Sequence, residues 1–414
     1  MRFTTGLVGA LLLALYAGCA STAATGVPST DGGDAPSSAG DPFDVPIDGV
    51  THDQVTEFNR GDDLFGLPLR ESDGLGPLYT RAACAACHEE GVRGPGLVQK
   101  MSVVESDGIT TAADQSKLPF GHTIHPLMTA SAKTAVLPPP NDPTIKVSIR
   151  VGPSVLGRGY MEAVLDSEIE RVASEQASRT DAIHGRVNHV AYASESNPDR
   201  RFHTHQKGDM VIGRFGLKAR VATLDDFTAD ALQGDMGITS PLRPTEFTNP
   251  DGLTDDLKPG IDTTIENVNV RAMYMRFLAI PKRASITDHG KELFIQTKCS
   301  VCHAPSLKTR PDYPIALLAG IDAPIFTDLL LHNMGDALAD GMVDGEAKSR
   351  DWRTTPLIGL RFNKTFLHDG RAQTIEEAIL LHAGQDSEAG EAVQVFQILS
   401  AADHQALLDY VSAL

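Results

Sequence analysis

Lys298-Cys299-Ser300-Val301-Cys302-His303 is the stretch that decides the fold, because it contains a C-x-x-C-H sequence that the chain carries twice. The other copy is Cys84-Ala85-Ala86-Cys87-His88. C-x-x-C-H is the attachment sequence of c-type haem: the two thiols bond to the porphyrin and the histidine becomes the proximal iron ligand. The sequence therefore predicts two covalent haem c groups, with His88 and His303 as their proximal ligands.

Three other readings of the cysteines are open: a structural zinc site made by the four thiols, a redox-active C-x-x-C, and a chance match. A zinc site does not need a histidine directly after each cysteine pair. A thioredoxin-like motif would need a βαβ setting, which the sequence does not indicate. The repetition of the motif behind an export signal favours haem.

The N-terminus predicts export. Arg2 and the apolar run 6–17 form a signal peptide, which we place at residues 1–19. Ala17-Gly18-Cys19 resembles a bacterial lipobox, so we expect lipidation of Cys19 and attachment to the outer membrane on the periplasmic side. Tyr16 departs from that pattern, and cleavage after Ala20 or Ala23 is the alternative. Residues 20–44 have almost no large apolar side chain and predict a disordered tether.

Composition limits the partners. The 414 residues contain 54 acidic and 36 Lys or Arg residues, a formal net charge of -18. This charge disfavours nucleic acid and anionic membrane surfaces, so contact with a membrane is expected only through the lipid anchor. It favours a small basic electron-carrier protein as a partner. Four of the five cysteines belong to the two motifs, so no structural disulfide is expected.

We expect a mainly α fold with two cytochrome c-like haem domains. Residues 45–282 form the N-terminal haem domain, with long loop-rich insertions, and residues 283–414 resemble a class I cytochrome c domain. Apolar periodicity predicts helices over residues 160–177, 268–281 and 288–294. A last helix is expected behind Asp403 as its N-cap. Thr374 and Glu377 have capping-box spacing at the start of another helix, whose apolar face includes His382.

Five strings in order around the two motifs resemble the bacterial di-haem oxidoreductase family, whose members are described as peroxidases or thiol oxidoreductases and belong to the di-haem cytochrome c peroxidase superfamily. They are Gly213-Arg214-Phe215-Gly216-Leu217-Lys218-Ala219, Gly234-Asp235-Met236-Gly237-Ile238-Thr239, Leu329-Leu330-Leu331-His332-Asn333-Met334-Gly335, Trp352-Arg353-Thr354 and Leu367-His368-Asp369-Gly370-Arg371-Ala372. The chain departs from the family at Leu217, where a tryptophan is expected. Residues 243–267 also lack the extra cysteines of many relatives.

The resemblance implies roles for the two haems. The C-terminal haem would receive electrons, with His382 as its distal ligand at the place where a methionine is common, although a histidine on an apolar helix face is by default a core residue. The N-terminal haem would be the reactive one. His122 is the candidate for its distal ligand, with His125 and Met128 close by, and a surface or structural role is the alternative. Arg214 and Lys218 are candidates for contacts with haem propionates.

Other assignments stay open. Trp352 is either a core aromatic or a bridge between the haems. The loop 329–340, with His332, Met334, Asp336 and Asp340, could line the cleft between the haems or bind calcium, and we assign no calcium. No catalytic acid-base residue is identified. The family also implies homodimers as an option.

The leading function is a di-haem peroxidase that takes electrons from a small exported donor, a cytochrome c or a copper protein, and reduces peroxide or a similar small oxidant. The first alternative is an electron-transfer lipoprotein without catalysis. The second is long-range oxidation of a protein or organic substrate, as in the methylamine-dehydrogenase maturation enzymes that the sequence also resembles.

Overall fold

Ten helices are seen in the computed structural model, which describes residues 43–254, 257–284 and 287–414. The expected signal peptide, Cys19 and the tether up to residue 42 lie outside these ranges. In chain order the helices are α1 (His52–Gly66), α2 (Arg158–Ala163), α3 (Asp166–Ala177), α4 (Leu224–Met236), α5 (Ile265–Phe277), α6 (Asp288–Gln296), α7 (Cys299–Cys302), α8 (Ile375–Leu381), α9 (Gly390–Gln397) and α10 (Ala401–Ala413). Within the described residues no helix is both long and apolar enough to span a membrane.

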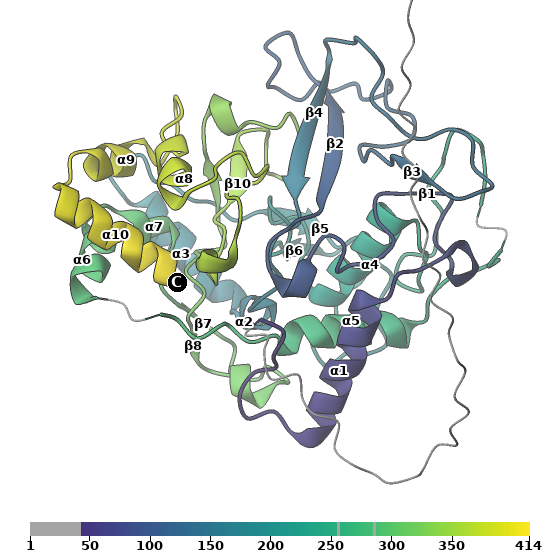
Figure 1. The fold of residues 1–414 in the computed structure, drawn as a ribbon, viewed down its shortest axis with the longest axis horizontal. Helices are drawn as coiled ribbons and strands as arrows, with labels where there is room; N and C mark the ends of the chain where they lie inside the picture. The colour runs from purple at the N-terminus through teal and green to yellow at the C-terminus, as the bar shows by residue number, and fades with distance from the viewer. Residues whose placement is uncertain (1–42, 255–256, 285–286) are drawn as a thin grey trace, which may run out of the picture. The chain divides into compact units, whose positions relative to one another are not determined.

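The strands pair only two at a time in the described residues, always antiparallel. The pairs are β1 (Leu78–Tyr79) with β3 (Leu127–Met128), β2 (Leu97–Val103) with β4 (Ile145–Val151), β5 (His189–Ala191) with β6 (Met210–Ile212), β7 (Leu307–Lys308) with β8 (Asp322–Ala323), and β9 (Leu331–Asn333) with β10 (Asp351–Arg353). Long loops separate them, and much of the chain is neither helix nor strand (Figure 1).

Helices α1 and α5 cross closely beside the first C-x-x-C-H motif. Thr51 and Gln54 form a capping box that starts α1, and Thr264 caps α5. A Cβ at Gly61 would lie 2.6 Å from the Cβ of Tyr274, so only glycine permits this approach. The carbonyl of Phe65, at the end of α1, accepts a hydrogen bond from the Ala85 amide at 3.2 Å. This crossing therefore positions the first motif.

Helices α6 and α10 cross in the same way beside the second motif. Thr287 caps α6, and a Cβ at Gly290 would lie 2.7 Å from both the Ala406 carbonyl oxygen and the Cβ of Tyr410. Phe294 and Tyr410 pack in one apolar cluster with Leu407 and Leu414. The expected helix ahead of the motif and the expected C-terminal helix are both present. In Figure 1, α6, α8, α9 and α10 gather on one side, away from α1 and α5.

Three local expectations need correction. The helix expected over 160–177 is broken at Val164 and Leu165, because Val164 forms a bridge with Thr309 and the Leu165 amide donates to Lys308. Helix α10 is capped by Ser400, whose hydroxyl accepts from the Asp403 amide. In α8 the Thr374 side chain accepts from the Glu377 amide, but the Glu377 carboxylate accepts from the Gln373 amide, so the capping box is half formed.

The largest apolar core joins the two parts of the chain that we expected to be separate domains. Leu307, Tyr313, Ile315 and Leu318 are buried in the same cluster as residues of α1, α2, α3 and α5. Residues 307–325, which the sequence suggests belong to the C-terminal domain, therefore complete the N-terminal core. The boundary at residue 283 stays a prediction.

A network of buried charges lies at the centre of this core. The guanidinium of Arg276 on α5 donates to the Glu162 carboxylate of α2 at 2.6 and 3.0 Å, and Tyr313 donates to the same carboxylate at 2.7 Å. Burial alone raises the pKa of Glu162, but the charge and hydrogen bonds of Arg276 outweigh it, so the net shift of that pKa is downward. The network ties α2, α5 and the 307–325 segment together.

Removal of one partner from this network should lower the stability of the fold. We expect Arg276→Met to lower the free energy of unfolding by roughly 3–5 kcal/mol, because it leaves the Glu162 carboxylate buried without its counter-charge. The matched control is Arg60→Met, which breaks an exposed ion pair with Glu266 and should cost less than about 1 kcal/mol. Denaturant titrations of both variants provide the measurement, and equal losses would contradict this account.

Candidate functional site

Both C-x-x-C-H motifs fold as single helical turns. In the first, the amides of Cys87 and His88 donate to the Cys84 carbonyl at 3.0 Å. In the second, α7 contains the two cysteines and the His303 amide donates to the Cys299 carbonyl at 2.9 Å. Side chains three apart on a helical turn point to the same side. All four thiols are free and half-buried, which suits attachment of each pair to one porphyrin edge.

The two motif histidines are held in the same way. Nδ1 of His88 lies 2.7 Å from the Pro153 carbonyl oxygen, and Nδ1 of His303 lies 3.3 Å from the Phe326 carbonyl oxygen. A carbonyl can only accept, so Nδ1 carries the hydrogen and Nε2 keeps the lone pair that binds a metal. Burial lowers the pKa of each imidazole to about 4, which keeps both neutral. The residues present therefore fit two axially ligated haems.

His382 lies within electrostatic reach of His303. It is the C-cap residue of α8, and its Nδ1 donates to the Ala378 carbonyl at 2.6 Å, so its Nε2 also keeps a lone pair. After burial, the strongest effect on the pKa of His303 is the charge of His382, which lowers it. The helix predicted from the sequence thus brings this imidazole near the second motif.

The sequence candidates for the distal side of the first haem lie around β2 and β3. His122 is half-buried, and both its ring and its carbonyl pair with Met101 of β2. His125 is buried, and its Nε2 donates to the Gly234 carbonyl at 2.8 Å. Met128 is 40% exposed. The assignment of His122 as a ligand stays a prediction.

Arg214 and Lys218 are buried and bonded to protein groups. Arg214 donates to the Val164 carbonyl at 2.9 Å and pairs with Asp166. Lys218 is fully buried, and its Nζ donates to the carbonyls of Lys348 and Asp351 at 2.7 and 2.8 Å. It also pairs with Asp340 at 3.1 Å. Their proposed contacts with haem propionates stay predictions.

Trp352 on β10 is buried and stacked on His368, with ring centroids 3.8 Å apart. The Lys218 ammonium lies 4.3 Å from the Trp352 ring centroid, and the Arg150 guanidinium lies 5.8 Å from it. The neighbouring carbonyls of Thr365 and Leu367 accept hydrogen bonds from Arg93, five residues after His88. The loop that holds His368 therefore contacts the loop that follows the first motif.

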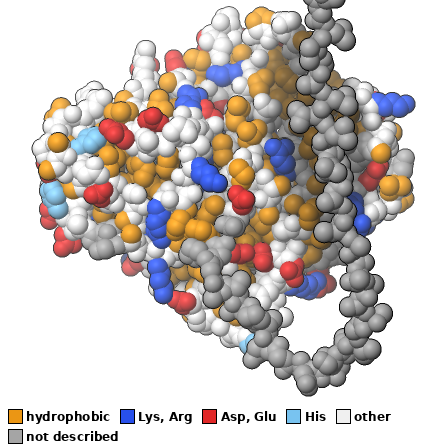
Figure 2. Space-filling model, viewed as in Figure 1, with side chains coloured by type: hydrophobic (Ala, Val, Ile, Leu, Met, Phe, Trp, Pro, Cys, Tyr) orange, Lys and Arg blue, Asp and Glu red, His pale blue; other side chains and the backbone are white. Residues whose placement is uncertain are grey.

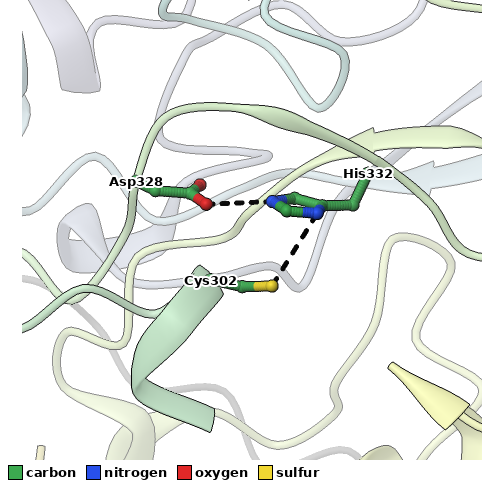
Figure 3. A group of neighbouring side chains, drawn as sticks. All are labelled: Cys302, Asp328 and His332. Atoms are coloured by element: carbon green, nitrogen blue, oxygen red, sulfur yellow. Dashed lines mark hydrogen bonds and ion pairs between the residues drawn. The ribbon is translucent and has the colours of Figure 1, made fainter. Parts of the chain in front are cut away.

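A charged network unforeseen in the sequence lies against the second motif. His332 is 3% exposed, with Nε2 2.9 Å from an Asp328 oxygen and Nδ1 2.7 Å from a Glu388 oxygen. Its Nδ1 is also 3.7 Å from the Cys302 sulfur (Figure 3). Burial lowers the pKa of His332, but the charges of Cys302 and Asp328 outweigh burial and raise it well above its usual value. The imidazole ring of His332 is thus held between two carboxylates beside the sulfur of Cys302.

The acidic residues of the loop 329–340 do not converge on one site. Asp336 pairs with Arg350, whereas Asp340 pairs with Arg150 and Lys218. Cys302, Asp328 and His332 are the one group in the described ranges whose donor atoms are close enough for a metal ion. Both His332 nitrogens already face carboxylates, and Cys302 belongs to the haem motif. We therefore assign no metal to this loop.

A second unforeseen feature is Asp235, at the end of α4. The Thr80 amide donates to the Asp235 carbonyl at 2.7 Å, which fixes this residue beside the segment that enters the first motif. Burial, and then the charge of Asp235, raises the pKa of the Cys87 thiol to about 11, and Asp235 also contributes at Cys84. Burial raises the pKa of Asp235 itself, and the nearby Lys100 opposes the shift. Nothing in the sequence string around Asp235 signals this proximity.

Three solved structures resemble this chain only weakly. The diheme peroxidase BthA of Burkholderia thailandensis is 14% identical over 90% of this chain and 88% of its own, with a TM-score of 0.39. A one-residue variant of it is 13% identical with a TM-score of 0.38 and the same coverage. Hydrazine synthase of Kuenenia stuttgartiensis is 14% identical over 94% of this chain and 100% of its own, with a TM-score of 0.35. We draw no conclusion about this chain from TM-scores this low. No curated protein matches the chain.

The comparison with protein families is decisive. The model of the family described as "Di-haem oxidoreductase, putative peroxidase" matches residues 140–414. The match contains the second motif, α8 with His382 and the Trp352 strand, and begins after the first motif. It covers well over half of the 414 residues. This chain is an enzyme of the di-haem oxidoreductase family.

Proposed function

We propose that this enzyme is an exported di-haem c-type peroxidase, in which electrons pass from the C-terminal haem to the N-terminal haem and reduce peroxide there. The observation that carries the proposal is a contrast between the two motifs. The proximal histidines are held alike, but a second imidazole, that of His382, is within electrostatic reach of His303, whereas the carboxyl group of Asp235 is within electrostatic reach of the cysteines of the first motif.

His303 and His382 suit an electron-transfer haem. Two neutral imidazoles, each with Nδ1 bonded to a backbone carbonyl, provide two strong nitrogen ligands. A haem closed on both sides by nitrogen passes electrons without binding oxidants, and its potential is lower than that of a His/Met haem. We propose this pair as the ligands of the electron-entry haem.

The first motif suits chemistry. When bound, haem supplies redox-active iron that can deliver electrons to peroxide. Reduction of hydrogen peroxide to two waters consumes two electrons and two protons, so the site needs a group that moves protons. Asp235 is the carboxyl group that the fold brings to the first motif, with Lys100 within electrostatic reach. We propose Asp235 as the acid-base residue, a role that the sequence alone could not assign.

The donor, by this proposal, is a small basic cytochrome c or copper protein in the periplasm. The formal charge of -18 would attract such a partner. On the face drawn in Figure 2, acidic and basic side chains are interspersed, so a docking surface there would be guided by local rather than uniform charge. Lipid anchoring through Cys19 and dimer formation are parts of the same proposal that rest on the sequence and the family resemblance.

Electron paramagnetic resonance tests the proposed function directly. In the oxidised or half-reduced protein with both haems attached, we expect one low-spin haem and one high-spin haem, and turnover of hydrogen peroxide with a reduced cytochrome donor. Two haems that stay low-spin in every redox state would favour the electron-transfer lipoprotein instead. A high-spin haem without peroxide turnover would favour oxidation of a protein or organic substrate.

Replacement of the proposed distal ligand should change the second haem alone. His382→Met exchanges a nitrogen donor for sulfur, so we expect a methionine charge-transfer band in magnetic circular dichroism and a higher potential at one haem. His289→Met is the control, because His289 is exposed and pairs with Asp403. The ligand assignment is wrong if the His382→Met spectrum equals that of the control.

Loss of the proposed acid-base group should slow the reaction with peroxide. We expect Asp235→Asn to reduce that rate by roughly 10²–10⁴-fold while both haems remain attached. Lys100→Met removes a charge that lowers the pKa of Asp235. That pKa then rises, and the pH below which the carboxylate is lost moves upward. Asp53→Asn, at an exposed position on α1, is the control. An unchanged rate in Asp235→Asn excludes the role.

A further inference from the structure

Tyr274 links the first haem motif to a pair of carboxyl groups. It lies on α5, is 1% exposed, and its ring centroid is 5.1 Å from that of Phe65. Phe65 in turn lies 6.1 Å from the ring of His88. These are ordinary packing distances for aromatic rings. The rings of His88, Phe65 and Tyr274 thus pack one after another, from the proximal ligand of the N-terminal haem to a buried phenol.

The phenol has a ready proton acceptor. The Tyr274 hydroxyl donates to an Asp44 carboxylate oxygen at 2.9 Å. The Asp44 carboxyl group is also hydrogen bonded to Asp62 of α1. Burial, together with the charge of Asp44 and this hydrogen bond, raises the pKa of Asp62 to about 7, so one proton is shared by two carboxyl groups near neutral pH. The Asp44 oxygen that accepts the hydrogen bond of the phenol is the atom placed to take its proton.

The position of the pair also suits proton release. Asp44 and Asp62 are both half-buried, whereas the Tyr274 ring is inside the core. Gly61, next to Asp62, permits the close approach of α1 and α5 that places the carboxyl group beside the phenol. Oxidation of a phenol becomes much easier when its proton has somewhere to go, because a protonated phenol radical cation is a very strong acid.

We propose that Tyr274 is a redox-active tyrosine that gives one electron to the N-terminal haem site and its phenolic proton to the Asp44–Asp62 pair. This inference rests on the proposed reaction with peroxide, which is the oxidant. With haem bound at the first motif, peroxide would be the two-electron oxidant of the site, and Tyr274 would supply one of the electrons that restore it. The phenolic O–H bond breaks, the proton forms a new O–H bond on Asp44, and a neutral tyrosyl radical remains.

The same hydrogen bond also anchors residues 43–47 to α5, where the Ile47 amide donates to the Phe277 carbonyl at 2.8 Å. An anchor and a relay make different predictions. If the Tyr274–Asp44 hydrogen bond serves only as an anchor, its loss changes only the stability of the fold. If Tyr274 relays an electron and a proton, a radical forms on that tyrosine alone. The test therefore reads the radical itself, with thermal unfolding as the measure of stability.

The experiment uses the full chain with both haems attached and no electron donor. One equivalent of hydrogen peroxide is added, the sample is freeze-quenched, and electron paramagnetic resonance is recorded alongside the haem absorption. We expect a tyrosyl radical whose hyperfine pattern narrows when the protein contains ring-deuterated tyrosine. Tyr274→Phe keeps the ring that packs on Phe65 and should abolish the signal. Tyr192→Phe is the control, because Tyr192 is equally buried but packs on His203 and His205.

A second variant tests the proton acceptor. Asp44→Asn keeps an oxygen that can accept the hydrogen bond of the Tyr274 hydroxyl but cannot take up its proton, so the radical should form roughly 10²-fold more slowly. A haem absorption change without any tyrosyl radical, or a radical that persists in Tyr274→Phe, overturns the relay and leaves the peroxidase proposal intact. The absence of any haem change with peroxide overturns both.

Discussion

The structure depends on one constraint: each motif imidazole must stay neutral with its Nδ1 hydrogen bonded and its Nε2 available to iron. The chain meets this constraint with backbone carbonyls from distant segments, Pro153 for His88 and Phe326 for His303. Phe326 has a positive φ of 49°, a conformation that is costly for a non-glycine residue. The surrounding core holds this conformation because Phe326 itself is buried in the cluster of α6 and α10. The packing that buries Phe326 therefore also holds the carbonyl that orients His303.

The two haem sites differ in what lies beside these similar ligands. A second imidazole and a charged His332 network accompany His303, which suits a site that only exchanges electrons. The half-buried carboxyl group of Asp235 is within electrostatic reach of the first motif, where proton transfer would be needed. Burial strengthens the electrostatic influence of these groups at both sites, because charges interact more strongly where water is excluded. One fold can thus support two haem chemistries through side chains that are far from the motifs in sequence.

The sequence predicted what depends on local patterns. The helices α5, α6, α8 and α10 follow from apolar periodicity, which neighbouring residues determine. It could not predict what depends on tertiary contacts. The 160–177 helix breaks because Val164 pairs with Thr309, and residues 307–325 fill a core made mainly by earlier segments. Asp235 and Tyr274 look ordinary in sequence, because their importance comes from groups brought near them by folding.

The surroundings of the two most prominent aromatic residues argue for different roles. The Lys218 and Arg150 cations lie 4.3 and 5.8 Å from the Trp352 ring centroid. A positive charge about 4 Å from a developing radical cation is worth about 4 kcal/mol of repulsion at an effective dielectric constant of roughly 20, although Asp340 offsets part of it. Tyr274 instead faces two carboxyl groups that can accept its proton. Loss of an electron is thus opposed at Trp352 and assisted at Tyr274, so the charges that stabilise the fold also select which aromatic residue can be oxidised.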